Sequence, residues 1–304
     1  MAEQAFPPLI IEAAINGATP KSRNPASPRT PAEIAEVGLA CLEAGASIIH
    51  NHNDEGLLDR PGSAHSAEPY IEAWRAILAK RPDALLYPTM GGGGEGIDIA
   101  VRYAHIPALA EAGVMRVGLV DPGSVNVGGM SREGIPAGNL TYINTFADAD
   151  YMVRTCFEHK LGPSISCFEP GFVRVALAHH RAGTLPPGSM VKFYFGGEFA
   201  NFGLPATEPS LNAYVSMLEG TGLQWSVAAL SGDVVGCGMA ELAIRRGGHV
   251  RVGLEDYAGP RKPNNVELVE ELVALAKSCG RAVATPTEAA AILGLQLPAY
   301  GATG

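Results

Sequence analysis

Two histidines close an apolar stretch in the first sixth of the chain. Residues 47–49 form a short apolar run after a glycine, and His50 and His52 stand at its end. Residues i and i+2 of a β-strand point to the same face, so both imidazoles are expected on one side. The pair is either two ordinary strand-end histidines held by hydrogen bonds or part of a metal site that needs a further protein ligand.

The best source of a third ligand lies near the other end of the chain. The segment His249-Val-Arg-Val-Gly-Leu-Glu-Asp256 reads as another apolar strand, with Glu255 just beyond it. Two imidazoles and one carboxylate with an open coordination position describe a catalytic Zn²⁺ site. Mn²⁺, Fe²⁺ and Co²⁺ accept the same ligands. We therefore expect His50, His52 and Glu255 to bind a divalent metal, zinc in the first place.

Arg251 and Asp256 add charged groups beside this predicted site. An arginine within a buried strand is costly unless it is paired, and Arg251 could meet Asp256 or a substrate carboxylate in a bidentate fashion. The alternative is that Glu255 and Asp256 form a solvated turn or a helix cap.

Thr89 precedes a glycine run at 91–94, which is either a flexible turn or a place where backbone N–H groups approach an anion.

The elements that must position these residues alternate as strand and helix, about eight times. Strands are predicted at 8–15, at the His50–His52 stretch, and at 84–89, 114–120, 164–168, 190–195, 224–229 and 249–254. Helices are predicted at 30–45, 67–80, 97–111, 145–159, 172–181, 210–218, 234–246, 266–278 and 287–293, with a glycine-rich loop at 121–139. Such alternation indicates parallel β-α units, and eight of them in 304 residues fit a (β/α)₈ barrel.

The competing α/β architecture is an open, doubly wound sheet. That fold usually carries Gly-x-Gly-x-x-Gly after its first strand, whereas this chain has Asn16-Gly17-Ala18-Thr19 there. No linker divides the sequence. We therefore predict one (β/α)₈ barrel domain over residues 1–304, with a short C-terminal extension.

Active sites of such barrels form at the C-terminal ends of the strands. The polar residues expected at that rim are Asn16, His50, His52, Thr89, Asp121, Ser124, Asn126, Ser166, Glu169, Glu198, Ser231, Asp233, Arg251, Glu255 and Asp256. Polar side chains gathered at one rim are typical of a functional site.

Composition narrows the possible partners and location. The net charge of −9 argues against broad binding to nucleic acid or anionic membranes, which depends on a basic surface. Residues 1–8 do not resemble a signal peptide, and no stretch approaches the run of about 18 apolar residues that could span a membrane. Its five cysteines form no Cys-x-x-Cys pair, which suits reduced thiols in the cytoplasm.

Several segments together carry a resemblance to a known family. They are Ala13-Ala-Ile-Asn-Gly-Ala18, Thr30-Pro-Ala-Glu33, the stretch from Glu43 to His52, Thr89-Met-Gly-Gly92, the stretch from Gly247 to Asp256, and Ala284-Thr-Pro286. With these segments the chain resembles, over nearly its whole length, the β-keto acid cleavage enzymes, the family of 3-keto-5-aminohexanoate cleavage enzyme.

The resemblance implies an activity and a role for each site residue. Zn²⁺ would be held by His50, His52 and Glu255, and Asp256 and Arg251 would be the catalytic acid–base pair. The implied reaction converts a β-keto acid and acetyl-CoA into acetoacetate and the shortened acyl-CoA by a retro-Claisen route. The resemblance also implies a homo-oligomer, a tetramer.

The chain departs from the family pattern among the expected substrate contacts, which are Asn16, Thr19, Thr89, Ser166 and Glu169. Thr19 stands where a family member has a glutamate for the substrate ammonium, and Ser166 also replaces a glutamate. Thr89 takes the place of a serine. Glu12, in the first strand, either supplies the missing carboxylate or is paired within the barrel. The identity of the substrate is therefore not implied.

Two other functions fit the same residues. One is a metal-dependent barrel aldolase or hydrolase that works without coenzyme A. The other is a metalloprotein that binds an acyl-CoA or a keto acid without turnover.

Overall fold

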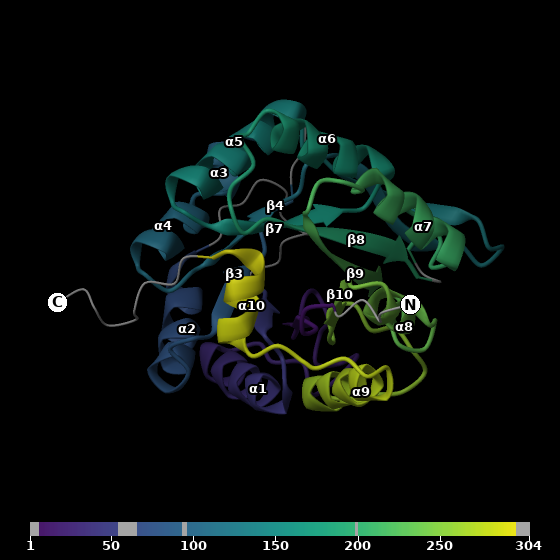
Figure 1. The fold of residues 1–304 in the computed structure, drawn as a ribbon, viewed down its shortest axis with the longest axis horizontal. Helices are drawn as coiled ribbons and strands as arrows, with labels where there is room; N and C mark the ends of the chain where they lie inside the picture. Colours follow the sequence, from purple (N-terminus) through teal and green to yellow (C-terminus); the bar gives the residue numbers. More distant parts are fainter. Residues whose placement is uncertain (1–5, 54–65, 93–95, 198–199, 296–304) are drawn as a thin grey trace.

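Eight parallel strands surround a central axis in the computed structural model, which describes residues 6–53, 66–92, 96–197 and 200–295 (Figure 1). The strands are β1 (Ile11–Ala14), β2 (Ile48–Asn51), β3 (Leu85–Pro88), β4 (Val117–Val120), β7 (Gly162–Cys167), β8 (Met190–Gly196), β9 (Gln224–Leu230) and β10 (His249–Val252). The expected C-terminal extension falls mainly on residues 296–304, the glycine run ends on 93 and 94, and Glu198 was expected at the rim. All of these positions lie outside the described residues.

The order of the strands decides between the two predicted architectures. Neighbours in the sheet run β3-β2-β1-β10-β9-β8-β7-β4, and every pair in this order is parallel. Because the first strand pairs with the last, the sheet curls into a nearly closed barrel, with β3 and β4 at its seam. The predicted single-domain (β/α)₈ barrel is confirmed, and the doubly wound alternative is wrong.

Helices surround the strands, as Figure 1 shows. They are α1 (Pro31–Ala44), α2 (Glu68–Lys80), α3 (Ile99–Arg102), α4 (His105–Glu111), α5 (Phe146–Glu158), α6 (Pro170–Arg181), α7 (Glu208–Met217), α8 (Met239–Arg245), α9 (Asn265–Ser278) and α10 (Pro286–Leu293). Thr30 and Glu33 form the capping box expected at the start of α1. None of the described helices is long and apolar enough to cross a membrane.

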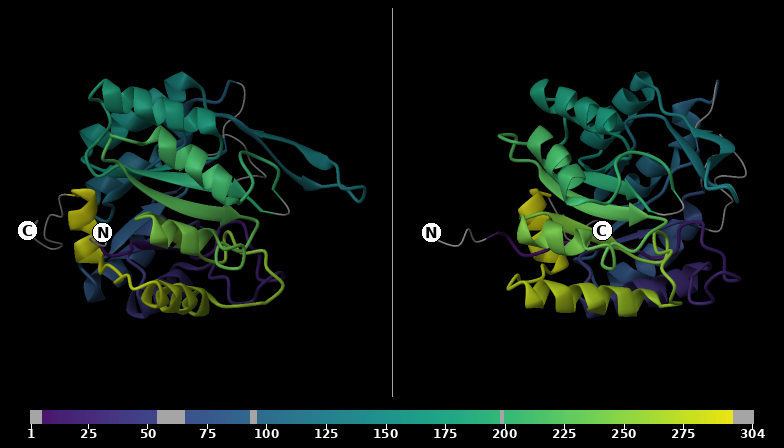
Figure 2. Two further views of the ribbon diagram at one scale, coloured as in Figure 1. Left: turned by 45° about the vertical axis from the view of Figure 1, so that its right-hand side comes forward. Right: turned by 90° about the vertical axis from the view of Figure 1, so that its right-hand side faces the viewer.

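Two predictions of local structure were wrong. The helix expected at 97–111 is divided into α3 and α4; Pro107 has no N–H to donate and is tolerated in the first turn of a new helix, not deep inside a longer one. The glycine-rich loop expected at 121–139 contains an antiparallel hairpin, β5 (Val125–Met130) and β6 (Pro136–Tyr142). Its glycines hid the alternation of a strand, and the hairpin projects from the barrel in the left view of Figure 2.

The two ends of the barrel differ. The segment before α10 binds the N-terminal ends of the first two strands: Leu9 donates to the Ala282 carbonyl, and the Ser47 hydroxyl donates to the Ala284 carbonyl at 2.6 Å. Leu295, just after α10, lies over Gly162 at the start of β7. This helix therefore covers the N-terminal end of the barrel and leaves the other end for chemistry.

Candidate metal and acid–base site

His50, His52 and Glu255 meet at the C-terminal end of the barrel. β1 pairs with β2 on one side and with β10 on the other, so the ends of the two outer strands face each other across it. His50 Nε2 lies 3.1 Å from Glu255 Oε2, and His52 Nε2 lies 3.3 Å from Glu255 Oε1. Gly17 permits this approach, because a Cβ there would stand 2.2 Å from Glu255 Cγ.

The three side chains fit a divalent metal. Their ligand atoms all lie within 4.8 Å of one another. Among the described residues, buried atoms of all three have no hydrogen-bond partner: His50 Nδ1, His52 Nε2 and Glu255 Oε2. Burial lowers the pKa of His50 to about 4, so its imidazole is neutral at pH 7. Burial would raise the pKa of Glu255, but Arg251 and His50 bring it well below its usual value. Neutral imidazole and ionised carboxylate are the forms that coordinate a cation.

Arg251 joins this cluster to Asp256. Its Nε lies 2.8 Å from Asp256 Oδ2 and its Nη2 lies 3.0 Å from Oδ1, which is a bidentate pair. Nη2 also lies 2.8 Å from Glu255 Oε1. Burial raises the pKa of Asp256, and Arg251 opposes that effect. The guanidinium group therefore holds the carboxylates of Glu255 and Asp256 in one fixed arrangement.

Glu12 lies beneath this cluster and is already paired. Its Oε1 accepts a hydrogen bond from Arg251 Nη1 at 3.0 Å and from Lys192 Nζ at 2.7 Å, and it also binds the Tyr87 hydroxyl. Burial alone would raise the pKa of Glu12, but Lys192 and Arg251 lower it to about 2. The Tyr87 ring packs on His50 with centroids 4.4 Å apart. Of the two hypotheses for Glu12, the structure favours pairing within the barrel.

Comparison with known proteins identifies the family. The model of the beta-keto acid cleavage enzyme family matches residues 8–295. The chain belongs to this family. It is 33% identical to the 3-keto-5-aminohexanoate cleavage enzyme of Fusobacterium nucleatum, over 95% of this chain and 98% of that protein. It is 29% identical to the 3-oxoadipate:acetyl-CoA acetyltransferase of Cupriavidus necator, over 95% of each.

A solved structure supports the fold. The ternary complex of ObcA with a C4-CoA adduct and oxalate superimposes with a TM-score of 0.65 at 19% identity, covering 90% of this chain and 68% of that one. The match to the family and the identity to its members confirm the resemblance to the β-keto acid cleavage enzymes that the sequence motifs carry. The expected enzyme class, an acyltransferase acting on β-keto acids, agrees with the family and with the names of these relatives.

Two of the residues expected to contact substrate, Asn16 and Thr19, form hydrogen bonds with the backbone. The Asn16 amide donates to the carbonyls of Pro28 and His52 and accepts from the N–H of His52. The Thr19 hydroxyl donates to the Leu254 carbonyl at 2.8 Å. Both side chains are buried. They shape the loops around the metal cluster, and their polar atoms are largely occupied.

The other three expected contacts lie around the same rim. Thr89 follows β3, is partly exposed, and its carbonyl oxygen is 2.7 Å from His105 Nε2. Ser166 is buried on β7, in register with Lys192. Glu169 precedes α6 and accepts the backbone N–H of Gly203 at 2.9 Å.

Sequence reasoning missed several residues around the site. Tyr87 and Lys192 lie within otherwise apolar strands. A charged residue in such a strand is unusual, so the sequence could have indicated a role for Lys192. Asp121 was expected at the rim, but its hydrogen-bond partner was not predicted. The partner is Tyr142, whose hydroxyl donates to Asp121 Oδ2 at 2.6 Å from the hairpin that was predicted as a loop. Burial raises the pKa of Asp121, and the Tyr142 hydroxyl opposes that effect.

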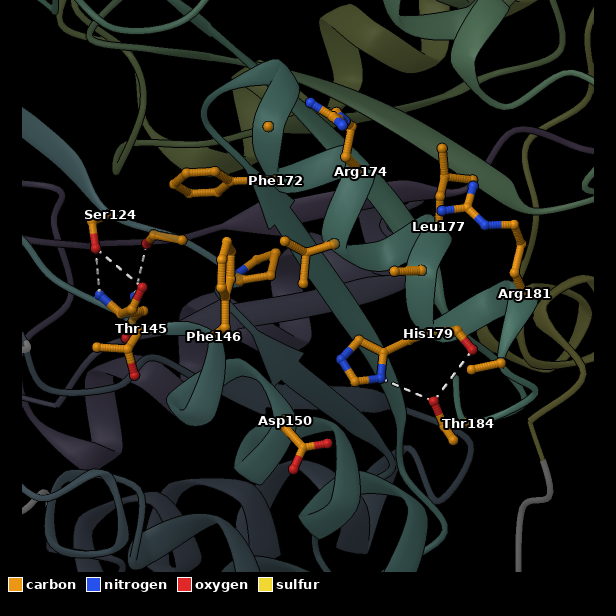
Figure 3. Close-up of a pocket in the computed structure, with 17 residues that line it drawn as sticks. Ser124, Thr145, Phe146, Asp150, Phe172, Arg174, Leu177, His179, Arg181 and Thr184 are labelled. Carbon is orange, nitrogen blue, oxygen red and sulfur yellow. Dashed lines mark hydrogen bonds between the residues drawn. The ribbon is translucent and has the colours of Figure 1, made fainter.

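A large cavity lies elsewhere, between α5 and α6 on the outside of the barrel. Its volume is about 1320 Å³, and Figure 3 shows Phe146, Phe172, Arg174 and Arg181 around it. His50, His52 and Glu255 are not among the residues that line it. The candidate site therefore lies at the barrel rim and not in this surface cavity.

Proposed function

We propose that the chain cleaves a β-keto acid with acetyl-CoA, giving acetoacetate and the shortened acyl-CoA, in a metal-dependent reaction. One observation carries this proposal: Arg251 contacts both Glu255 of the metal cluster and Asp256, so electrophilic and acid–base groups converge on one point. The Cupriavidus relative is a 3-oxoadipate:acetyl-CoA acetyltransferase, and this supports acetyl-CoA as co-substrate.

His50, His52 and Glu255 would hold Zn²⁺, which when bound supplies a Lewis acid for the keto oxygen. Asp256 would take the proton from the carbon between the keto and carboxylate groups, and Arg251 would keep the Asp256 carboxylate oriented and ionised. The fixed guanidinium would also stabilise negative charge that develops on the substrate.

The bonds balance without an oxidant or reductant. The deprotonated carbon attacks the acetyl-CoA carbonyl, and the CoA thiolate leaves. The thiolate then attacks the original keto carbon, the carbon–carbon bond to that carbon breaks, and Asp256 returns the proton to acetoacetate. The acetyl group has moved to carbon and the original acyl group to sulfur.

Incubation with acetyl-CoA and a panel of β-keto acids tests the proposal, with mass spectrometry of the CoA esters as readout. Formation of a new acyl-CoA together with acetoacetate supports it. Keto acid cleavage without acetyl-CoA would indicate an aldolase or hydrolase, and free CoA formed without a keto acid would indicate thioester hydrolysis. Thermal stabilisation by CoA and keto acids with no product would indicate a binding protein.

Zinc as the metal, a homotetramer and a cytoplasmic location belong to the same proposal. Two imidazoles and a carboxylate suit zinc. The described cysteines are all unpaired, which suits a reducing compartment. Elemental analysis of the purified protein and light scattering coupled to gel filtration test the metal and the tetramer.

A further inference from the structure

The two most exposed phenylalanine side chains of the described residues lie on helix α5. Phe146 is 78% exposed and Phe157 is 57% exposed. The opposite face of the helix packs on the barrel through buried residues such as Met152 and Cys156. Large apolar side chains that gather on one surface are typical of a place that another molecule covers.

The two rings stand on either side of an exposed ion pair. Phe146, Asp150, Arg154 and Phe157 occupy positions i, i+4, i+8 and i+11, and this spacing brings them onto one stripe of an α-helix. Arg154 Nε lies 3.0 Å from Asp150 Oδ2, and the two side chains are 65% and 51% exposed. We call these four residues the α5 stripe.

The α5 stripe is complementary to itself. Its midpoint falls between Asp150 and Arg154, and it ends in a phenylalanine on each side, about three helical turns apart. If a second copy of the helix lies antiparallel on the first, about a twofold axis through this midpoint, Phe146 faces Phe157 of the second copy. Asp150 then faces Arg154 of the second copy. An interface between identical chains about such an axis requires this kind of self-complementary surface.

A groove beside the α5 stripe has room for a ring from the second copy. The cavity of about 1320 Å³ lies between α5 and α6, and Figure 3 shows Phe146 and Asp150 beside it. Gly171 and Ala178 of α6 also line it, and their side chains are too small to fill it. Phe157 is not among the lining residues. Each copy therefore offers a groove at one end of the stripe and an exposed ring at the other.

We propose that the α5 stripe is an interface between two copies of this chain, packed about a twofold axis with their α5 helices antiparallel. Phe157 of each copy enters the groove beside Phe146 of the other, and Asp150 pairs with Arg154 across the axis twice. Removing four rings from water drives the association. The charges add little in one exposed helix, but across an interface they specify the partner and its orientation.

This inference does not depend on the proposed reaction. A twofold interface is compatible with a dimer and with a tetramer that contains such a dimer. It identifies a surface of contact, whereas the proposed function concerns the opposite charges and the metal ligands at the barrel rim. The two can therefore be tested separately.

Light scattering coupled to gel filtration, over a range of protein concentrations near neutral pH, tests the rings. Phe157→Asp should halve the molar mass of the wild-type protein and raise the Kd of association by about 10²-fold or more. The axis brings the changed residue into two contacts, and each buried ring contributes about ten-fold or more. Because Phe157 is exposed in a single copy, circular dichroism should show an unchanged fold. A monomeric wild type, or a variant with the wild-type mass, would overturn the inference.

Charge reversal tests whether Asp150 and Arg154 meet across the axis. Asp150→Arg brings arginines of the two copies together, and Arg154→Asp brings aspartates together, so each variant alone should have half the wild-type mass. An equimolar mixture of the two variants places opposite charges at both contacts again, and the wild-type mass should return. A mixture that stays at half the mass would refute the α5 stripe as the interface.

A matched ion pair on α8 is the control. Glu241 and Arg245 are also four residues apart and exposed, with Arg245 Nη2 2.7 Å from Glu241 Oε1. Glu241→Arg and Arg245→Glu should leave the molar mass unchanged, and a fall in mass as large as that of the α5 variants would overturn the inference. Cleavage of a β-keto acid by a protein whose α5 variants keep the wild-type mass would refute the interface alone. Self-association through α5 without cleavage would refute only the proposed reaction.

Discussion

Lys192→Met removes one of the two cations that hold Glu12 beneath the metal cluster. Lys192 Nζ lies 2.7 Å from Glu12 Oε1 and 2.6 Å from the Tyr87 hydroxyl, and the lysine and glutamate side chains are each only 1% exposed. Methionine keeps the length and apolar character of the lysine chain, so the change is mainly one of charge. Glu12 keeps Arg251 at 3.0 Å but loses its nearer partner.

The expected magnitude follows from this geometry. Removing one partner of a buried ion pair costs about 3 to 5 kcal/mol of unfolding free energy, because the remaining charge is left in a medium of low polarity. Since Arg251 still compensates Glu12, we expect the lower end, about 3 kcal/mol. Glu12→Gln should lower the unfolding free energy for the same reason, because it leaves Lys192 without its carboxylate partner.

The double variant decides whether the cost is due to the charge pair. Glu12→Gln with Lys192→Met removes both charges together, so its destabilisation should fall short of the sum of the single changes by about 2 kcal/mol or more, within the range found for contacting residues. Urea unfolding followed by circular dichroism measures the unfolding free energy of the wild type, the two single variants and the double variant, all at one fixed metal content. Lys21→Met, which breaks an exposed pair with Glu33, is the control and should cost less than about 1 kcal/mol.

The activity of these variants tests the role of Glu12 toward Arg251. If Glu12 keeps Arg251 in place, Glu12→Gln should lower kcat more than it raises KM, with the metal content by elemental analysis unchanged. Single changes that add up in the double variant, or a Lys192→Met protein as stable as the wild type, would refute the reasoning.

Three further outcomes are expected. His50→Ala should lose the bound metal and the activity together, and elemental analysis showing a fully metallated, active variant would contradict the metal assignment. Asp256→Asn should retain metal and fold while kcat falls by about 10² or more, the usual effect of losing a positioned acid–base group. Burial and Arg281 lower the pKa of His249 to about 3, so the unfolded chain alone takes up its proton as the pH falls below about 6.5. His249 therefore makes the folded state lose stability from about pH 6.5 down to pH 3, by up to about 1.4 kcal/mol per pH unit, and His249→Asn should flatten that slope in pH-dependent urea unfolding.

The meeting of His50, His52 and Glu255 could be predicted because each part of the group has a local signature. His50 and His52 share a face by the two-residue period of a strand, and Arg251, Glu255 and Asp256 lie within six positions of one another. The alternation of short apolar strands and helices predicts a parallel barrel, and a barrel brings the C-terminal ends of its strands to one rim. Local pattern and a general rule of the fold were sufficient to place these residues together.

The surroundings of the cluster depend on pairings that no local pattern contains. Tyr87 and Glu12 are 75 positions apart and Glu12 and Lys192 are 180 positions apart, yet their side chains meet inside the barrel. Which inward residues touch across a barrel depends on strand register and closure, and these are properties of the whole sheet. The same holds for Tyr142, which reaches Asp121 from a hairpin that its glycines disguised.

The sequence by itself therefore determined the barrel, the family and the residues that we propose bind metal and exchange protons, since strand period and short motifs encode them. Only the tertiary structure decided that Glu12 is paired with Lys192 and Arg251 instead of facing the substrate. The physical reason is that a buried charge is defined by its partner, and here each partner comes from a distant strand.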